Sequence, residues 1–249
     1  MTSRSTFNLF GLVIHGYDWE EVRRRVAAHD IPERPYWIVT ANPEILLYSK
    51  HNPWYWELLR QADLRTVDGF GLWLAGKMTG TRLTGVALAE ELVKLGHAQQ
   101  HTVGIIGGKG ESADKAVWHL RREFSGLRIT SIPMGDVMPQ GEEIESIANR
   151  DTKKWPDILF VALGHPKQEA WIAKNLAKLH GVRVVVGVGG TVDFWSGQSK
   201  RAPEFLQSIG LEWMWRLFHE PKRWKRIVRA TVFFPLAVVG DEITKRRLT

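Results

Sequence analysis

The chain has 249 residues, enough to bury the core of a full α/β domain, and it contains no cysteine, which excludes disulfides and thiolate metal sites. Its formal net charge is +7, and residues 199–249 hold +6 of this, with eleven Lys and Arg against five Asp and Glu. The first residues lack the pattern of a signal peptide and no apolar run reaches about 18 residues, so we expect neither a cleaved leader nor a membrane-spanning helix.

Strand and helix patterns alternate along residues 7–195. Short apolar, β-branched runs predict strands, and apolar residues spaced three or four apart predict helices. This alternation predicts an α/β fold with a doubly wound, mostly parallel, Rossmann-like sheet. Asp18 is expected to cap the helix 19–28, and Ser112 is expected to cap the helix 112–124. In chain order the predicted strands are 7–14, 36–40, 64–67, 101–106, 129–133, 158–163 and 182–188. The predicted helices are 19–28, a helix from 45 with Pro43 near its first turn, 53–61, 72–77, 84–95, 112–124, 142–149 and a helix around 171–176.

Three loops at strand ends are candidates for a ligand site. The strand at 158–163 leads into the polar loop 165–169, and the strand at 182–188 leads into the glycines of GVGGTVD. In open parallel sheets ligands bind outside the carboxyl ends of the strands, where both loops fall. The third loop, GGKG at 107–110, would let backbone N–H groups approach a phosphate. Its spacing is neither that of a dinucleotide fingerprint nor that of a P-loop, so a plain turn is an equal alternative.

The composition changes near residue 196, which predicts a core domain at 1–195 and a basic helical appendage at 196–249. An amphipathic helix is expected over 204–218, and a helix or kinked pair over the apolar stretch 227–240. Lys and Arg are interleaved with this stretch, as is typical of helices that lie in a membrane interface. The alternative is a dimerisation or docking helix with a solvated charged face, in which case the apolar tail would make a homo-oligomer.

Five motifs in a fixed order link the chain to a known family. They are TANPE, VDGFG, GHPKQE, GVGGTVDFWSG and KRAPEFLQSIGLEWMWRLFHEPKRWKR. From about residue 7 to residue 226 the chain resembles the WecG/TagA/CpsF glycosyltransferases, glycosyltransferase family 26. The resemblance implies inverting transfer of a sugar from a UDP-sugar to a polyprenyl-diphosphate-linked sugar by a peripheral protein at the cytoplasmic face of the bacterial inner membrane. It also implies that no metal or other cofactor is needed, and the lack of a D-x-D triad agrees with this.

The resemblance places the chemistry at the ends of two strands. Asp68 matches the position proposed as the family's general base, and inverting transfer needs one carboxylate to take the acceptor proton. Thr40 and Asn42 match the family's T-x-N motif and are assigned to contacts with substrate hydroxyls or diphosphate. Structural alternatives are that Asp68 caps the following helix or holds a turn, and that Asn42 is a turn residue.

Further residues are expected to hold the substrates. The amide of Gln168 suits sugar recognition, Lys167 suits phosphate, and Asp193 suits ribose or uracil unless it merely caps a turn. Arg82 corresponds to an arginine that the family places near the donor diphosphate. The other expected substrate-binding residues are Gly107, Gly108, Gly189 and Gly190, where backbone would approach the nucleotide, and Arg216, Arg223 and Arg226, which match basic positions of the family's appendage that face lipid phosphate and complete the pocket.

Two departures from the family pattern leave the donor sugar open. Asn42 precedes Pro43, which pushes it toward extended geometry. His165 stands where Met or Ser is common; it is either a second titrating group or, as we favour, a ring in a loop. N-acetylmannosamine or a related sugar is the first expectation for the transferred group, and UDP-glucose or a UDP-uronic acid is the alternative donor.

Two other classes of function would account for part of the sequence. A non-catalytic nucleotide- or nucleic-acid-binding module would explain the glycine loops and the basic tail, but nucleic-acid tails are poor in apolar residues. We therefore expect an anionic membrane surface as partner and no nucleic acid. A dehydrogenase is disfavoured because no G-x-G-x-x-G follows the first strand.

Overall fold

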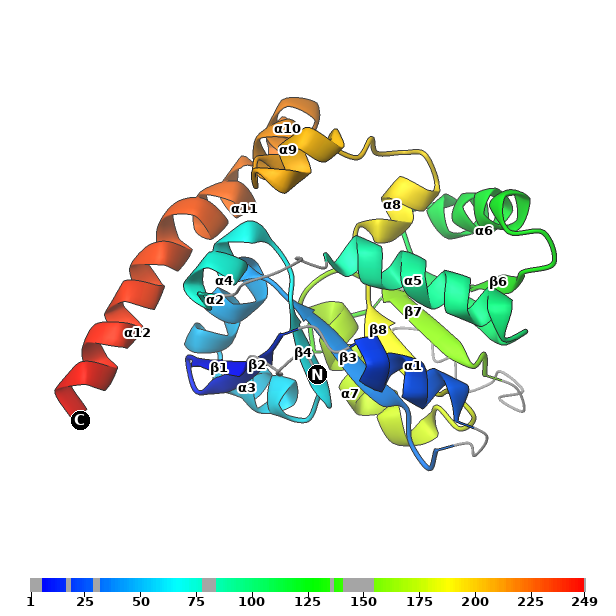
Figure 1. Cartoon of the computed structure of the whole chain (residues 1–249), viewed down its shortest axis with the longest axis horizontal. Coiled ribbons are helices and arrows are strands. Elements are labelled where there is room, and N and C mark those ends of the chain that lie inside the picture. The colour runs from blue at the N-terminus through cyan, green and yellow to red at the C-terminus, as the bar shows by residue number, and fades with distance from the viewer. Residues whose placement is uncertain are drawn as a thin grey trace.

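The computed structural model describes residues 6–16, 19–28, 32–77, 84–134, 137–140 and 155–248. Its centre is one eight-stranded sheet in the order β1-β2-β4-β3-β8-β7-β5-β6 (Figure 1). The pair β1 and β2 is antiparallel and the other neighbouring pairs are parallel. The mostly parallel α/β sheet predicted above is therefore confirmed. The strands are β1 (Thr6–Leu9), β2 (Leu12–His15), β3 (Tyr36–Ala41), β4 (Leu64–Val67), β5 (Thr102–Gly107), β6 (Arg128–Ile132), β7 (Ile158–Ala162) and β8 (Val184–Gly187).

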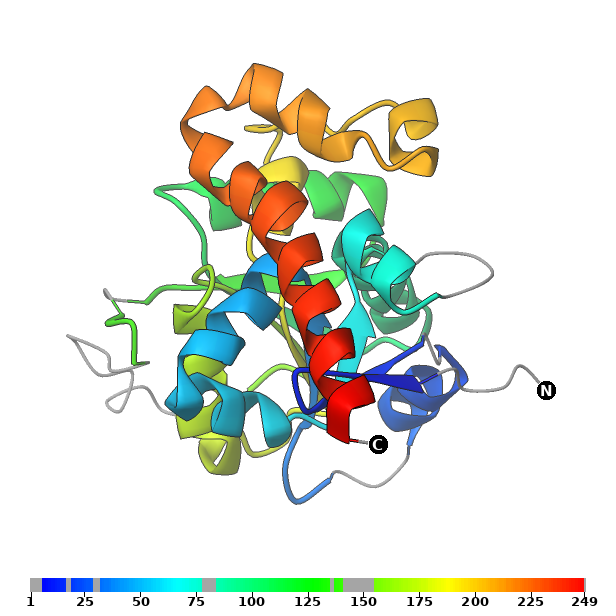
Figure 2. The ribbon, with the colours of Figure 1, turned by 90° about the vertical axis from the view of Figure 1, so that its left-hand side faces the viewer.

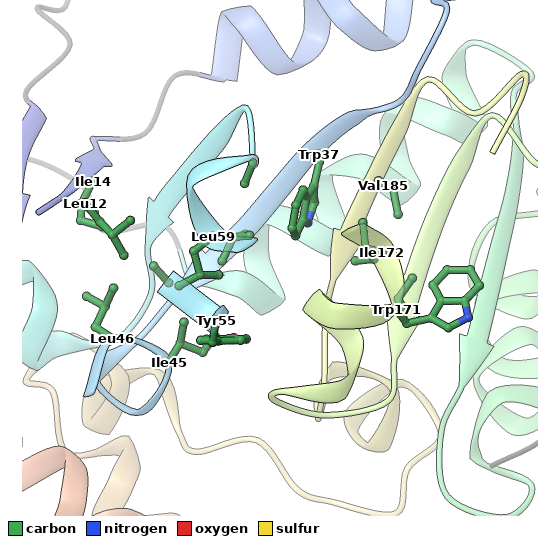
Figure 3. Packing of buried hydrophobic residues seen from close by; sticks show 14 of the residues in the cluster. Leu12, Ile14, Trp37, Ile45, Leu46, Tyr55, Leu59, Trp171, Ile172 and Val185 are labelled. Atoms are coloured by element: carbon green, nitrogen blue, oxygen red, sulfur yellow. The ribbon is translucent and has the colours of Figure 1, made fainter. Parts of the chain in front are cut away.

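Helices cover both faces of the sheet. Trp37 and Val185 face a core shared with α2, α3 and α7 (Figure 3). Ile38 and Val184 face a second core shared with α1, α5, α6 and α8. Successive strand residues point to opposite faces, so the continuous apolar runs of β3 and β8 fill both cores. The helices are α1 (Trp19–Ala27), α2 (Pro43–His51), α3 (Pro53–Arg60), α4 (Phe70–Ala75), α5 (Gly85–Ala98), α6 (Ser112–Glu123), α7 (Lys167–Asn175), α8 (Thr191–Trp195), α9 (Glu204–Ser208), α10 (Glu212–His219), α11 (Trp224–Val228) and α12 (Phe234–Leu248).

Two predicted elements are each broken by a residue in the left-handed region. The expected strand 7–14 is a hairpin, because Phe10 and Gly11 have φ of 53° and 78° and the side chain of Asn8 accepts a hydrogen bond from Gly11 N. The expected helix 204–218 is divided into α9 and α10 at Gly210, whose φ is 78°. A Cβ at that position would lie 2.4 Å from the ring of Phe70, so the break also brings α4 and the tail together.

Other predicted helix boundaries differ from the observed ones by up to about one helical turn. The loop after β7 is shorter than predicted, because α7 already begins at Lys167 and Gln168 N donates to Gly164 O. Ser112 is the first residue of α6 rather than its cap, and Glu111 holds the cap position without a side-chain bond. Helix α4 begins at Phe70, two residues before the predicted start. The expected helix 142–149, the cap at Asp18 and the substrate residue Arg82 lie outside the described residues.

The last part of the chain forms a long rod from α11 through a π-helical stretch, Arg229–Phe233, into α12 (Figure 2). It lies beside α2 and α4. Phe234 is 1% exposed and meets the ring of Phe10 edge-on, with centroids 6.4 Å apart. The other side of the rod leaves apolar side chains exposed at Val232, Phe233, Leu236, Val239 and Ile243. None of the helices in the described ranges combines the length and apolarity needed to cross a bilayer.

Candidate active site

The carboxyl ends of the parallel strands meet at one edge of the sheet. Val39 of β3 and Val161 of β7 both pair with Gly187 of β8, so these three strands end level with one another. The residues that follow them therefore surround a common space. It holds a cavity of about 390 Å³, here called the polar pocket.

The polar pocket brings together thirteen of the fourteen site residues predicted from the sequence; Arg82 lies outside the described residues. The thirteen are Thr40, Asn42, Asp68, Gly107, Gly108, Lys167, Gln168, Gly189, Gly190, Asp193, Arg216, Arg223 and Arg226. Their convergence from five strand ends and from the C-terminal segment is an observation of the structure, and their individual roles stay predictions.

Asp68 follows β4, and its Oδ1 accepts a hydrogen bond of 3.0 Å from Gly85 N at the start of α5. The carboxylate therefore caps a helix, but this is α5 and not the helix that follows it in sequence. Negative charge is favourable at the positive end of a helix. This contact orients the side chain at the edge of the sheet.

Thr40 and Asn42 are held by the backbone around them. Thr40 Oγ1 donates to Gly187 O over 3.1 Å. Asn42 Oδ1 accepts from Glu44 N and Ile45 N, each at 3.0 Å, and so caps α2. Asn42, for which a turn residue was the alternative, thus has the structural role of a helix cap. Its Nδ2 has no partner among the described residues and remains available to a ligand.

Gln168 is 4% exposed and links two parts of the pocket wall. Its Oε1 accepts from Gly189 N at 3.1 Å, and its Nε2 donates to Glu169 Oε1 at 2.7 Å. A Cβ on Gly187 would lie 2.7 Å from Gln168 Nε2, so the glycine is required for this approach. These contacts hold the glycine turn after β8, while sugar recognition by Gln168 stays a prediction.

The three arginines of the C-terminal segment reach the pocket and are each paired. Arg216 contacts Glu212 at 2.5 Å and stacks over the ring of Phe194. Arg223 pairs with Glu220 at 2.5 Å, and Arg226 pairs with Glu44 of α2 at 2.6 Å. The last contact spans 182 residues of sequence and ties the tail to the core.

Positive charge predominates around the polar pocket. Lys109 and Lys167 line it in addition to the three arginines, and neither lysine has an ion-pair partner in the described part of the chain. The carboxylates on the same wall are Asp68 and Asp193. Because each arginine already has a glutamate partner, the two lysines are the cations on this wall that most favour an anionic ligand. Lys109 could have been found from the sequence, because it lies inside the GGKG loop.

A second cavity of about 440 Å³, here called the apolar pocket, lies between the core and the C-terminal rod. No sequence pattern predicted it, because its walls come from α2, α4, α10 and the rod. It shares Asp68 and the three arginines with the polar pocket. Its apolar lining is Pro43, Phe70, Trp213, Ile227, Ala230 and Pro235.

His165 is a residue that the sequence interpretation undervalued. Its side chain is 9% exposed and lines the polar pocket, so it is more than a ring in a surface loop. Its Nδ1 lies 2.9 Å from the hydroxyl of Tyr55. Burial, followed by the charge of Glu169, raises the pKa of Tyr55 well above its ordinary value, so the phenol stays protonated.

These features are those of an α/β protein with a polar cavity at the carboxyl edge of a parallel sheet, which is where such folds bind their ligands. Comparison with known proteins narrows the class. The model of the glycosyl transferase WecG/TagA/CpsF family matches residues 7–248, and the chain belongs to this family. The family predicted from the five motifs is therefore confirmed, and with it the glycosyltransferase class.

Two relatives of known name are described as the same enzyme. The chain is 36% identical to the N-acetylglucosaminyldiphosphoundecaprenol N-acetyl-beta-D-mannosaminyltransferase of Bacillus spizizenii strain W23 over 195 residues, which are 77% of this chain and 74% of the relative. It is 31% identical to the enzyme of the same name from Staphylococcus aureus strain MRSA252 over 219 residues, 84% of this chain and 83% of the relative.

Proposed function

We propose that this chain transfers N-acetylmannosamine or a related sugar from a UDP-sugar to a polyprenyl-diphosphate-linked sugar in bacterial surface polysaccharide synthesis. The names of the relatives support this transferred sugar and an acceptor with N-acetylglucosamine on undecaprenyl diphosphate. Transfer proceeds with inversion and without a bound metal.

The polar pocket is the proposed donor site. A UDP-sugar carries two phosphates, and the two lysines and three arginines on the wall supply compensating charge. Gly107 and Gly108 have φ of 84° and 93°, which exposes backbone at the end of β5, and a Cβ on Gly108 would lie 2.5 Å from Ser112 Oγ. The backbone can therefore approach a nucleotide closely.

The apolar pocket is the proposed acceptor site. A lipid-linked sugar diphosphate needs cations for its phosphates and an apolar surface for the first part of its chain. Arg223 and Arg226 lie beside Ile227 and Pro235 in this pocket, so both requirements meet within one cavity.

The observation that carries the proposal is the position of Asp68 on the wall of both pockets. An acceptor hydroxyl in the apolar pocket would meet the sugar carbon of a donor in the polar pocket beside this carboxylate. Asp68 would take the hydroxyl proton as the oxygen attacks, which is the role of a general base in a single inverting displacement.

The exposed apolar side of the rod is the proposed contact with the membrane. Leu236 is 66% exposed and Phe233 56%, and basic residues such as Lys225 and Arg229 lie on exposed positions of the same rod. This combination suits a peripheral protein at an anionic surface on the cytoplasmic side, where an undecaprenyl-diphosphate acceptor would be reached.

The test is UDP release by the purified chain in vesicles, with a panel of UDP-sugars and a synthetic lipid-diphosphate-linked N-acetylglucosamine. We expect acceptor-dependent release with UDP-N-acetylmannosamine. Release with UDP-glucose or a UDP-uronic acid instead would replace the donor but keep the reaction. A chain that binds no UDP and releases none would overturn the proposal in favour of a binding module.

A further inference from the structure

The two ring nitrogens of His165 differ in their surroundings. Nδ1 lies 2.9 Å from Tyr55 Oη and 3.7 Å from Glu169 Oε2, on the side of α3 and α7. Nε2 is on the opposite edge of the ring and has no hydrogen-bond partner in the part of the chain that the structure describes. Because the ring lines the polar pocket, Nε2 is the atom left for a ligand there.

The imidazole is held in a fixed orientation by the aromatic rings around it. The rings of Tyr48 and Tyr55 meet it edge-on, with centroids 4.8 Å and 5.1 Å away. Tyr55 is 0% exposed, and it packs against Tyr48 as well. A ligand contact made by His165 would therefore need little side-chain ordering when the ligand binds.

The interior side of the ring also faces Glu169. This carboxylate is 2% exposed, and its Oε2 lies 3.7 Å from His165 Nδ1. Tyr55 and Glu169 therefore occupy the Nδ1 side of the imidazole. The nitrogen left to donate a hydrogen bond to a ligand in the polar pocket is Nε2.

We propose that His165, held in place by Tyr55 and Glu169 on its Nδ1 side, donates a hydrogen bond from Nε2 to the β-phosphate of the leaving UDP. This rests on the proposed function. The acceptor oxygen forms a bond to the sugar C1 and loses its proton to Asp68, while the bond from C1 to the β-phosphate oxygen breaks and its electron pair stays on that oxygen. His165 transfers no proton; it stabilises the negative charge that grows on the phosphate.

Two substitutions separate this contact from a structural role. His165→Asn keeps a polar atom near the Nδ1 position, facing Tyr55, and removes Nε2. His165→Gln places an amide near the Nε2 position and removes the Tyr55 contact. Binding of UDP and of UMP is measured by calorimetry, since UDP has the β-phosphate and UMP lacks it, and kcat is measured by UDP release. His180→Asn, at an exposed histidine, is the control.

We expect His165→Asn to weaken UDP binding by about 10- to 100-fold, to leave UMP binding unchanged and to lower kcat by about 100-fold. His165→Gln should retain more UDP affinity than His165→Asn, and His180→Asn should match the wild type. Tyr55→Phe, which acts through the imidazole, should weaken UDP binding less than His165→Asn does. Unchanged UDP binding in His165→Asn, or equal losses for UDP and UMP, would overturn the inference. A wild-type chain that binds no UDP would instead overturn the proposed function, and the inference with it.

Discussion

Asp68→Asn removes a negative charge from the wall shared by the two pockets. The amide oxygen can still accept the hydrogen bond from Gly85 N that Asp68 Oδ1 accepts at 3.0 Å, so the start of α5 is expected to stay in place. General-base catalysis contributes roughly 10²- to 10⁴-fold in rate, and turnover should fall by about that factor, equivalent to about 3–5 kcal/mol in activation free energy.

The assay is acceptor-dependent UDP release at saturating donor, accompanied by calorimetric UDP binding and a thermal melt. UDP affinity should be retained, because the substitution removes no cation from the polar pocket. Asp193→Asn is the matched control, because it neutralises the other carboxylate of that pocket, which does not line the apolar pocket. It should weaken UDP binding through the predicted ribose or uracil contact and leave most of the turnover at saturating donor. Asp68→Ala also deletes the acceptor for Gly85 N and should cost an additional 0.5–2 kcal/mol or so of stability.

Near-normal turnover of Asp68→Asn, with unchanged melting, would refute the assignment of Asp68 as base. A loss of turnover accompanied by an equal loss of UDP binding would also refute it, since it would show that the carboxylate supports the pocket rather than the proton transfer.

Three further predictions concern the metal, the tail and an ion-pair cluster. Excess EDTA should leave acceptor-dependent UDP release unchanged, and restoration of a lost activity by added Mn²⁺ or Mg²⁺ would contradict metal-independent transfer. Leu236→Glu, on the exposed side of the rod, should reduce co-sedimentation with anionic vesicles without changing the melting temperature. Phe234→Ala, at a buried position, should lower the free energy of unfolding by about 3–5 kcal/mol in a denaturant titration. Equal effects of the two substitutions on stability would contradict a rod with one buried and one exposed side. Asp157 has a lowered pKa because hydrogen bonds from Thr102 and Arg183 outweigh the opposing effect of burial. Its contribution is therefore present above its ordinary value of 3.8 and is lost as the pH falls through the lowered value, so the stability gap between wild type and Asp157→Asn should be largest at neutral pH and close in acid.

Much of the fold can be predicted from local patterns in the sequence. Continuous apolar runs such as 158–162 can be buried only in a sheet covered on both faces, and the helices between them force parallel strands. The misplaced boundaries occurred where one residue decides the backbone path. Gly210 divides a pattern that is amphipathic on both sides of it, because its φ is 78° and the ring of Phe70 occupies the space of a side chain.

The pocket residues at the strand ends were predictable because the strand ends of a parallel sheet share one edge. Their partners were not predictable in the same way. Gln168 has the composition of a sugar ligand, and its side-chain hydrogen bonds to Gly189 N and Glu169 become visible only when α7 and β8 are placed side by side. His165 gave no periodic signal, since its burial depends on aromatic rings more than a hundred residues earlier in the chain.

The sequence by itself determined the sheet, the glycine turns and the polar edge, because these depend on residue types at short spacing. Only the tertiary structure decided that the tail returns to this edge. Arg226 meets Glu44 across 182 residues, and Phe234 fills the first core, so the apolar pocket and its shared wall at Asp68 exist only when the rod is docked. Contacts of that range leave no periodic trace in the sequence, since they depend on how separate surfaces fit and not on the spacing of residues along either one.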